Sequence, residues 1–227
     1  MECCTFVALL KVCAKKKDLC EGRRLHIEIL RKGLLQKNSY LGSSLISMYV
    51  KCGMLAKAQE VLDTLPFRTQ FSWNALIAGY SQQGKGHDAL NCFERMQNEG
   101  LFPDVITYTC IVKACGIIGA IGKGKQMHDE ISRRGLLEKD VVLGSALVDM
   151  YAKCGALTKA IQVLKELPIR NVVSWNSLIA GFAQQGQGYR ALDCLEQMQI
   201  EGISPDEVTF ISILKACGTI GTIDKAK

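Results

Sequence analysis

The sequence predicts an all-α protein, a right-handed α-solenoid in which short helical hairpins stack on one another. Three observations lead to this fold class: apolar residues recur at helical spacing, glycine-containing breaks separate the helical stretches, and the whole pattern repeats. The segment 73–79 returns at 175–181 with one change, a displacement of 102 residues. Because one hairpin cannot bury its apolar face alone, repetition at a fixed interval indicates hairpins that cover one another.

The segment 70–104 shows the pattern of one hairpin. Its first helix places Trp73, Ile77 and Tyr80 on one face. A turn at 83–86 follows, and the break at 100–104 ends the second helix, because Gly favours the position after a helix and Pro cannot continue one. Short apolar runs such as 141–143 lead directly into helical spacing, so no strand is expected. The stripe of the second helix consists of Ala89, Cys92, Phe93 and Met96.

The same displacement relates motifs throughout the chain. Each 102-residue period holds three related units of unequal length, each with two apolar-periodic stretches and a glycine-containing turn. The recurring motifs are Lys51-Cys52-Gly53 at 153–155, Leu65-Pro66 at 167–168, and Lys113-Ala114-Cys115-Gly116 at 215–218, with an earlier copy at Lys11-Val12-Cys13.

The composition is that of a globular protein with a mild basic bias. Lys and Arg total 28 against 22 Asp and Glu, a formal charge of +6. This bias suits a polyanion partner, but a solvated helix face explains it as well. Much of it comes from Lys15, Lys16, Lys17, Arg23, Arg24, Arg31 and Lys32.

Neither membrane insertion nor secretion is expected. No stretch approaches the roughly 20 apolar residues of a transmembrane helix, and the chain opens directly into a helical pattern without a secretory signal. The 11 cysteines include no C-x-x-C pair. We therefore expect them to be reduced and buried, as small apolar residues.

These motifs and unit lengths resemble the pentatricopeptide repeat family, in particular the plant subclass in which P, L and S repeats alternate. The S-type units carry Met48-Tyr49-Val50-Lys51-Cys52-Gly53 and its copy at 150–155. The P-type units carry Ser72-Trp73-Asn74 and its copy at 174–176, and they end in Pro103-Asp104 and Pro205-Asp206. Incomplete units at both ends indicate a piece of a longer array. The resemblance covers the whole chain and divides it into L 3–38, S 39–69, P 70–104, L 105–140, S 141–171, P 172–206 and a partial L 207–227.

Helical-repeat proteins can read single-stranded RNA one base per repeat, because a polar side chain at a fixed point of each repeat pairs with one base edge. The resemblance implies that the fifth and the last residue of each unit do the reading. They are Asn74 with Asp104 and Asn176 with Asp206 in the P units, Ser43 with Thr69 and Ser145 with Asn171 in the S units, and Val7 with Asn38 and Thr109 with Asp140 in the L units. The second residue of each unit would pack against the base plane, which implies Cys4, Tyr40, Phe71, Ile106, Val142 and Val173.

By the same resemblance, Asn with Asp reads uracil and Ser or Thr with Asn reads adenine, while Thr109 with Asp140 leans toward guanine. Ser43 with Thr69 departs from the usual pairs, and Val7 offers no hydrogen bond. The implied target is 5′-n-n-U-n-A-U-3′, with a purine favoured at the second n.

A second interpretation of the same residues stays open. Asn, Asp, Ser and Thr are also preferred N-caps, and Asp104 or Asp206 could simply cap the next helix.

No motif predicts catalysis, a cofactor or a metal site. The start of the zinc deaminase signature, H-x-E, occurs at 26–28 and 128–130, but both copies lack the P-C-x-x-C partner and share one register of the repeat. The segment 119–125 matches G-x-x-x-x-G-K, but Gln126 replaces the Ser or Thr of a phosphate-binding loop and no strand precedes it. The remaining histidine, His87, is expected at the surface.

The resemblance implies the targeting module of an organellar RNA-editing factor, in a mitochondrion or chloroplast, which selects a cytidine for conversion to uridine. The chemistry would then belong to another domain or to a recruited partner. The alternative is a protein–protein scaffold, and the L units would dock accessory editing proteins. The apolar end faces of a short array also favour self-association.

Overall fold

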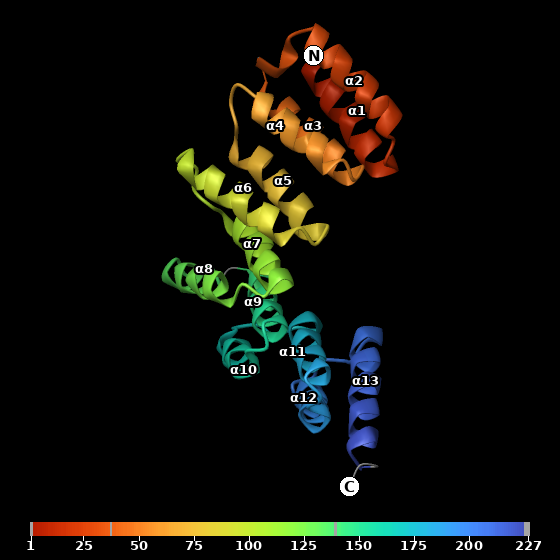
Figure 1. The fold of residues 1–227 in the computed structure, drawn as a ribbon, viewed down its shortest axis with the longest axis vertical. Helices are drawn as coiled ribbons and strands as arrows, with labels where there is room; N and C mark the ends of the chain where they lie inside the picture. Colours follow the sequence, from red (N-terminus) through yellow and green to blue (C-terminus); the bar gives the residue numbers. More distant parts are fainter. Residues whose placement is uncertain (1, 37, 139, 225–227) are drawn as a thin grey trace. The chain divides into compact units, whose positions relative to one another are not determined.

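The computed structural model describes residues 2–36, 38–138 and 140–224, and every regular element in these ranges is helical (Figure 1). The all-α prediction is confirmed. Residues 37 and 139 of the expected L units, and 225–227 of the expected partial unit, lie outside the described residues. The helices are α1 (Glu2–Lys16), α2 (Leu19–Arg31), α3 (Ser39–Lys51), α4 (Leu55–Thr64), α5 (Gln70–Gln82), α6 (Gly86–Asn98), α7 (Val105–Ile118), α8 (Ile121–Arg133), α9 (Val141–Lys153), α10 (Leu157–Glu166), α11 (Val172–Gln184), α12 (Gly188–Ile200) and α13 (Glu207–Asp224), with a short 3₁₀ turn, η1 (Leu34–Gln36).

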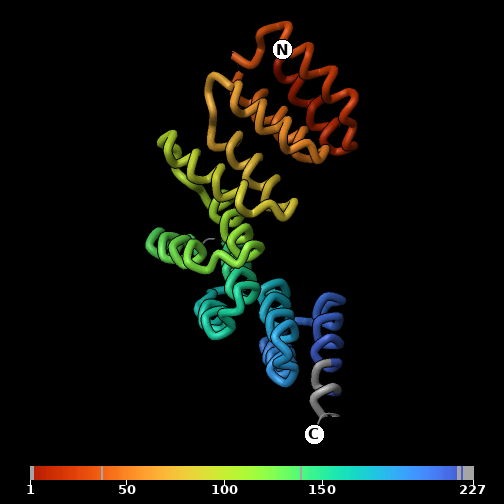
Figure 2. The backbone as a smooth tube through the Cα atoms, in the orientation of Figure 1, coloured from red at the N-terminus to blue at the C-terminus, as the bar shows by residue number. Residues whose placement is uncertain are grey.

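The chain divides into two compact units, Met1–Cys110 and Ile111–Lys227, with the boundary inside α7. In the first unit α1 with α2, α3 with α4 and α5 with α6 form hairpins, and α1, α3 and α5 pack in a row. In the second unit α9 with α10 and α11 with α12 form hairpins, and α9, α11 and α13 pack in a row. Figure 2 shows the path of the backbone through these hairpins. Each unit is therefore a stack of helical hairpins, as the repeat predicts.

The turn between α5 and α6 shows how the sequence ends a helix. Gly84 adopts φ of +74°, a left-handed conformation that glycine reaches without steric cost. Its N–H donates to the Ser81 carbonyl at 3.2 Å, and the Lys85 N–H donates to the Tyr80 carbonyl at 2.9 Å. This pair of bonds is a Schellman motif, which satisfies carbonyls that the helix leaves open at its end.

The core of the first P-type hairpin is the one that its periodicity predicts. Trp73 and Ile77 are fully buried, Tyr80 is half-buried, and Ala89, Cys92, Phe93 and Met96 are all buried. Burying a side chain of the size of Phe93 contributes roughly 1.5–3 kcal/mol to the stability of the fold.

Among the described residues, no helix combines the length and apolarity needed to cross a membrane.

The expectation that the cysteines are buried is wrong for most of them. Only Cys13, Cys92 and Cys115 are buried, whereas Cys4, Cys20 and Cys217 are exposed, and the others are half-buried free thiols. Burial depends on which helices cover a position as well as on its place in the repeat. Cys115 on α7 and Cys217 on α13 share one register, yet α13 is the last described helix. Burial raises the pKa of the Cys92 thiol to about 12, which makes it an inert packing residue.

Candidate nucleic-acid interface

The predicted pair of the first P unit, Asn74 and Asp104, is in direct contact. Nδ2 of Asn74 donates to the Asp104 carboxylate, with both oxygens at 3.1 Å. The carboxylate also accepts from the backbone N–H of Thr107 at 2.8 Å, so Asp104 caps α7 while it holds the amide. Asn74 is only 6% exposed, and its position at the fifth residue of the hairpin sets it against the first turn of α7.

Thr107 completes this site from the same turn of α7. Its hydroxyl, which is fully buried, lies 2.7 Å from Asn74 Oδ1 and 2.9 Å from Asp104 Oδ1, and it accepts from the Asp104 N–H. A hydroxyl carries a single proton, so it donates to one of the two oxygens at a time. The contact with Asn74 is the shorter of the two, and when the hydroxyl donates to Asn74 Oδ1 both ends of the amide are occupied.

The second P unit repeats this arrangement in α11 and α13. Nδ2 of Asn176 donates to Asp206 at 2.8 Å, and the buried Thr209 hydroxyl lies 2.6 Å from Asn176 Oδ1. The backbone N–H of Thr209 donates to Asp206 at 2.9 Å. This backbone hydrogen bond, together with the one from Asn176, lowers the pKa of Asp206 from its ordinary value.

The predicted pairs of the S units are also brought together. Ser43 Oγ lies 3.3 Å from Thr69 Oγ1, and Ser145 Oγ lies 3.2 Å from Asn171 Oδ1 and 2.9 Å from the Val141 carbonyl oxygen. Thr69 and Asn171 are the N-caps of α5 and α11, where each forms a capping box with the serine three residues on. As in the P units, the last residue of one hairpin caps the next and touches the fifth residue of its own.

In the L units the predicted polar residues have partners in their own helix or cap the helix that follows. Asn38 caps α3 by accepting from the Tyr40 N–H at 2.9 Å, and Val7 has no polar atom to meet it. Thr109 donates to the Val105 carbonyl of its own helix at 2.8 Å. Asp140 caps α9 through the Leu143 N–H at 2.7 Å. Thr109 and Asp140 belong to different compact units.

The residues expected to stack on bases are exposed apolar side chains. Tyr40 is 67% exposed and Phe71 is 59% exposed, with ring centroids 6.2 Å apart, and Ile106, Val142 and Val173 are exposed to a similar degree. Cys4 is exposed as well. Large apolar side chains left in solvent at matching positions of successive hairpins are typical of a binding surface.

In the first unit Tyr40, Phe71 and Ile106 line one hollow, here called the first groove, of about 450 Å³. Its walls combine residues of α1, α3, α5 and α7. Two lysines of the recurring motifs, Lys11 and Lys51, also line it, although the sequence did not predict them as site residues. The predicted site residues that line the first groove are Val7, Tyr40, Ser43, Phe71, Asn74 and Ile106.

The second unit has a smaller hollow, here called the second groove, of about 270 Å³. Lys113 and Asp149 lie beside it, so its rim carries charges of both signs. Asn176 and Asp206 are not among its lining residues. The predicted site residues that line it are Val142, Ser145, Asn171 and Val173.

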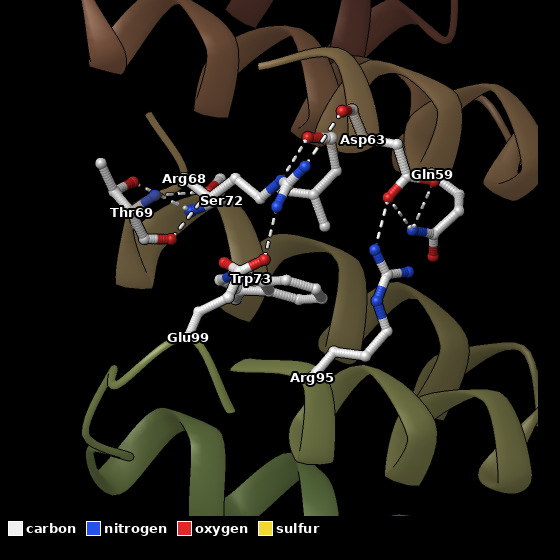
Figure 3. Close-up of polar contacts among 9 residues, drawn as sticks. Gln59, Asp63, Arg68, Thr69, Ser72, Trp73, Arg95 and Glu99 are labelled. Atoms are coloured by element: carbon white, nitrogen blue, oxygen red, sulfur yellow. Dashed lines mark hydrogen bonds and ion pairs between the residues drawn. The ribbon is translucent and has the colours of Figure 1, made fainter. Parts of the chain in front are cut away.

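The recurring tryptophan has a structural role at the end of its hairpin (Figure 3). Nε1 of Trp73 donates to Glu99 Oε2 at 3.0 Å, and Glu99 also pairs with Arg68. The guanidinium of Arg95 lies over the indole, 5.2 Å from its centroid, and pairs with Asp63 of α4. These contacts fix α5 against α4 and α6, and so position the helix that carries Asn74.

Sequence reasoning missed Thr107 and Thr209, although a signal was present. Both follow Pro-Asp at a fixed distance, as Asp-x-x-Thr, and they lie 102 residues apart. That spacing is a capping-box pattern in which the third residue after the cap returns a hydrogen bond. Their contact with the Asn amides joins residues 33 positions apart in the chain, which local patterns do not reveal.

The histidines of the H-x-E motifs have structural partners. Nδ1 of His26 lies 2.9 Å from the Tyr49 hydroxyl, and Nδ1 of His128 lies 3.0 Å from the Tyr151 hydroxyl. Burial lowers the pKa of both imidazoles, which favours the neutral ring. Within the described residues, no group of three or more His, Cys, Asp or Glu side chains is placed to hold a metal ion. His87 is exposed, as expected.

Hairpins stacked in this way, with a capping residue that touches the preceding hairpin at the end of each S and P unit, define a helical-repeat protein of the α-solenoid class. The chain belongs to the pentatricopeptide repeat family. A model described as the PPR repeat family matches residues 68–116 and 170–219, and a second, described as the PPR repeat, matches 43–66, 106–136 and 145–172.

Relatives of known sequence support this assignment over nearly the whole chain. A chloroplastic pentatricopeptide repeat-containing protein of Arabidopsis thaliana is 37% identical over 213 residues, which cover 94% of this chain and 34% of the relative. A mitochondrial one from the same plant is 36% identical over 241 residues, covering 97% and 26%. The chain thus spans about a third or less of the length of these two curated relatives.

Solved structures show the same fold. The pentatricopeptide repeat protein PPR10, in complex with an 18-nucleotide psaJ RNA element, matches with a TM-score of 0.81 at 24% identity, over 96% of this chain and 34% of that one. The nuclear proteinaceous RNase P 2 of A. thaliana matches with a TM-score of 0.55 at 14% identity, over 95% and 42%.

Proposed function

We propose that this chain binds single-stranded RNA sequence-specifically, one base per repeat unit. The observation that carries the proposal is the repeated site at Asn74 and Asn176, in which an amide is held between an Asp and a buried Thr of the next helix. The exposed apolar side chains at the second position of the P units, Phe71 and Val173, lie on the same helices as these two Asn residues. The structural likeness to PPR10, which was solved with RNA, agrees with this function.

The side-chain amides of Asn74 and Asn176 can discriminate between bases only if their orientation is fixed. An Asn amide has two N–H donors and two oxygen lone pairs, and Asp104 or Asp206 takes up one donor. The carboxylate accepts only, so it holds Nδ2 on its own side and prevents the amide from flipping. The remaining donor and lone pair keep one orientation. Such a site matches the donor and acceptor on the Watson–Crick edge of uracil and rejects a base with the reverse pattern.

The division into units that we propose is the alternation of L, S and P repeats, at 3–38, 39–69, 70–104, 105–140, 141–171, 172–206 and 207–227. The support lies in the junctions, since α3, α5, α7, α9, α11 and α13 begin at or next to these boundaries. It assigns uracil to Asn74 and Asn176 and adenine to Ser145 with Asn171. The proposed target remains 5′-n-n-U-n-A-U-3′.

We place the chain within a longer organellar protein. The relatives are two to four times as long as the matched segment, and two of them are named chloroplastic and mitochondrial. We propose that the chain itself is not an enzyme and that it directs C-to-U editing by positioning a cytidine for a domain or partner elsewhere.

The test is a fluorescence anisotropy titration against a short RNA that carries U-n-A-U, compared with RNAs in which either uracil is replaced by cytosine or guanine. We expect the matched RNA to bind about tenfold more tightly, or about 1.4 kcal/mol. Asn176→Ala should remove the preference at the last uracil and leave the preference at the first. The matched control is Asn91→Ala, which removes an exposed amide from α6.

Thermal unfolding of each variant separates a lost reading contact from a lost fold, because Asn176 is buried. Equal binding of all RNAs, with a steep salt dependence, would leave only attraction to phosphates and would overturn base reading. Absence of RNA binding at low salt would overturn the whole proposal.

A protein-docking scaffold is the second candidate function. The observation in its favour is an exposed apolar pair on the second helix of the first L unit, Ile27 at 51% and Leu30 at 54% exposure. Such a pair would suit an accessory editing protein. Ile27→Lys should then abolish capture of that protein while leaving RNA affinity unchanged, whereas Asn176→Ala should have the opposite effect.

A further inference from the structure

The chain holds two copies of the 102-residue period, residues 3–104 (the first copy) and 105–206 (the second copy). They differ at positions that line the two grooves. Tyr40 and Phe71 of the first copy correspond to Val142 and Val173 of the second, and Ser47 corresponds to Asp149. The reading pairs of the P units, in contrast, are identical in both copies, Asn74 with Asp104 and Asn176 with Asp206. The three differences in the grooves therefore concern how strongly each groove attracts a nucleic acid.

The first difference is electrostatic. In the second copy, Asp149 Oδ2 accepts from Lys153 Nζ at 2.7 Å, so that lysine is already neutralised. In the first copy Ser47 stands in place of the aspartate, and Lys51 makes no ion pair with any part of the chain that the structure describes. Lys51 and Lys11 both border the first groove, whereas the second groove is bordered by Lys113 and Asp149.

The second difference is in the stacking surface. Tyr40 and Phe71 present two aromatic rings at an interplanar angle of 32°, both more than half exposed. Aromatic rings stack on any base, so they add affinity without choosing sequence. Val142 and Val173 are similarly exposed but offer only small aliphatic surfaces.

The geometry points to a division of labour between the copies, and this inference rests on the proposed RNA-binding function. The first copy supplies most of the binding free energy, through free lysines that contact phosphates and aromatic rings that stack on bases. The second copy contributes mainly base selection, because its aspartate cancels one cation and its stacking residues are small. The ligand class is a single-stranded ribonucleic acid whose phosphates enter the first groove.

The test exchanges residues between the copies in the full chain, so each new residue is one that the other copy already accommodates. Ser47→Asp should neutralise Lys51 and weaken binding of the matched RNA about tenfold at low salt. It should also reduce the slope of log affinity against log salt by about 0.7, the loss of one single-strand phosphate contact. Asp149→Ser should do the reverse, with tighter binding and a steeper slope.

A second pair of variants tests stacking. The double substitution Tyr40→Val and Phe71→Val should weaken binding about tenfold or more with an unchanged salt slope, since no charge is lost. Val142→Tyr should tighten binding to every sequence alike. Both sets alter exposed or half-exposed positions, and unfolding curves check that the fold is retained.

The inference is overturned if Ser47→Asp and Asp149→Ser leave both affinity and salt slope unchanged while the unmodified chain binds RNA. It is also overturned if the valine exchange in the first copy has no effect. An unmodified chain that binds no RNA at low salt is a separate outcome, because it removes the proposed function itself along with this division of labour.

Discussion

The last residue of each S and P unit has two partners at once. Asp104 caps α7 and holds Asn74, and Asn171 caps α11 and contacts the Ser145 hydroxyl. Capping and contact with the fifth residue are therefore not alternatives. Because the cap position is fixed by the start of the next helix, the amide it holds is placed relative to that helix as well. Base reading, where it occurs, would then depend on the junction between hairpins.

Asp206 allows this coupling to be measured by titration. The Thr209 backbone N–H and Asn176 lower the pKa of Asp206 from its ordinary value. The stability that the ionised carboxylate contributes is therefore fully present above the ordinary Asp range near pH 4, and it is lost as pH falls through the lowered pKa. Asn176→Ala should raise the pKa of Asp206 toward its ordinary value. The measurement is an NMR titration of the side-chain carboxyl carbon.

Ser177→Ala is the control for that titration, since Ser177 Oγ donates to the Val173 carbonyl of its own helix. An Asp206 pKa that stays the same in Asn176→Ala would mean that the two side chains do not interact in solution.

At the scale of helices, close approach depends on glycines that face the neighbouring hairpin. A Cβ added at Gly181 of α11 would lie 2.9 Å from the Ala152 Cβ of α9 and 2.8 Å from Leu157. Ala152 has no torsion that could move its Cβ away, so the helices themselves would have to separate. Gly122 of α8, in the same compact unit, has open space around it.

These two glycines give a matched pair of substitutions. Gly181→Ala should destabilise the protein by about 1–3 kcal/mol, because it forces two packed helices apart. Gly122→Ala should stabilise it by about 0.5–1 kcal/mol, because it removes conformational freedom from the unfolded chain at no steric cost. Unfolding in urea measures both, and equal shifts of the same sign would contradict the close packing of α9 and α11.

At the scale of the whole molecule, contacts between neighbouring hairpins of a row add to the stability of each hairpin, as in other repeat proteins. The helix α13 packs on α11 and α12, but its other face carries Val208, Phe210, Ile211 and Leu214, between 46% and 70% exposed. A contiguous apolar helix face in solvent favours association.

We therefore expect this chain to self-associate as its concentration rises, through the exposed face of α13. Leu214→Lys should reduce that association, because a charge would have to be buried in the contact. Sedimentation velocity over a range of concentrations measures it. Gln199→Lys, which adds the same charge on the exposed side of α12, should leave the association unchanged.

The sequence by itself determined the all-α fold, the turns and the apolar faces of the hairpins. These features depend on interactions within about four residues, such as the spacing of Trp73 and Ile77 or the conformation of Gly84, and local patterns record them. The 102-residue displacement added the stacking of hairpins, since a repeated apolar face needs a repeated partner.

Only the tertiary structure decided which side chains meet across the junctions. Thr107 contacts Asn74, 33 residues away in the chain, and Lys11 and Lys51 line one groove. Cys115 is buried and Cys217 is exposed, although both hold the same place in the repeat. Such contacts depend on how neighbouring hairpins pack, and no short-range periodicity specifies that packing.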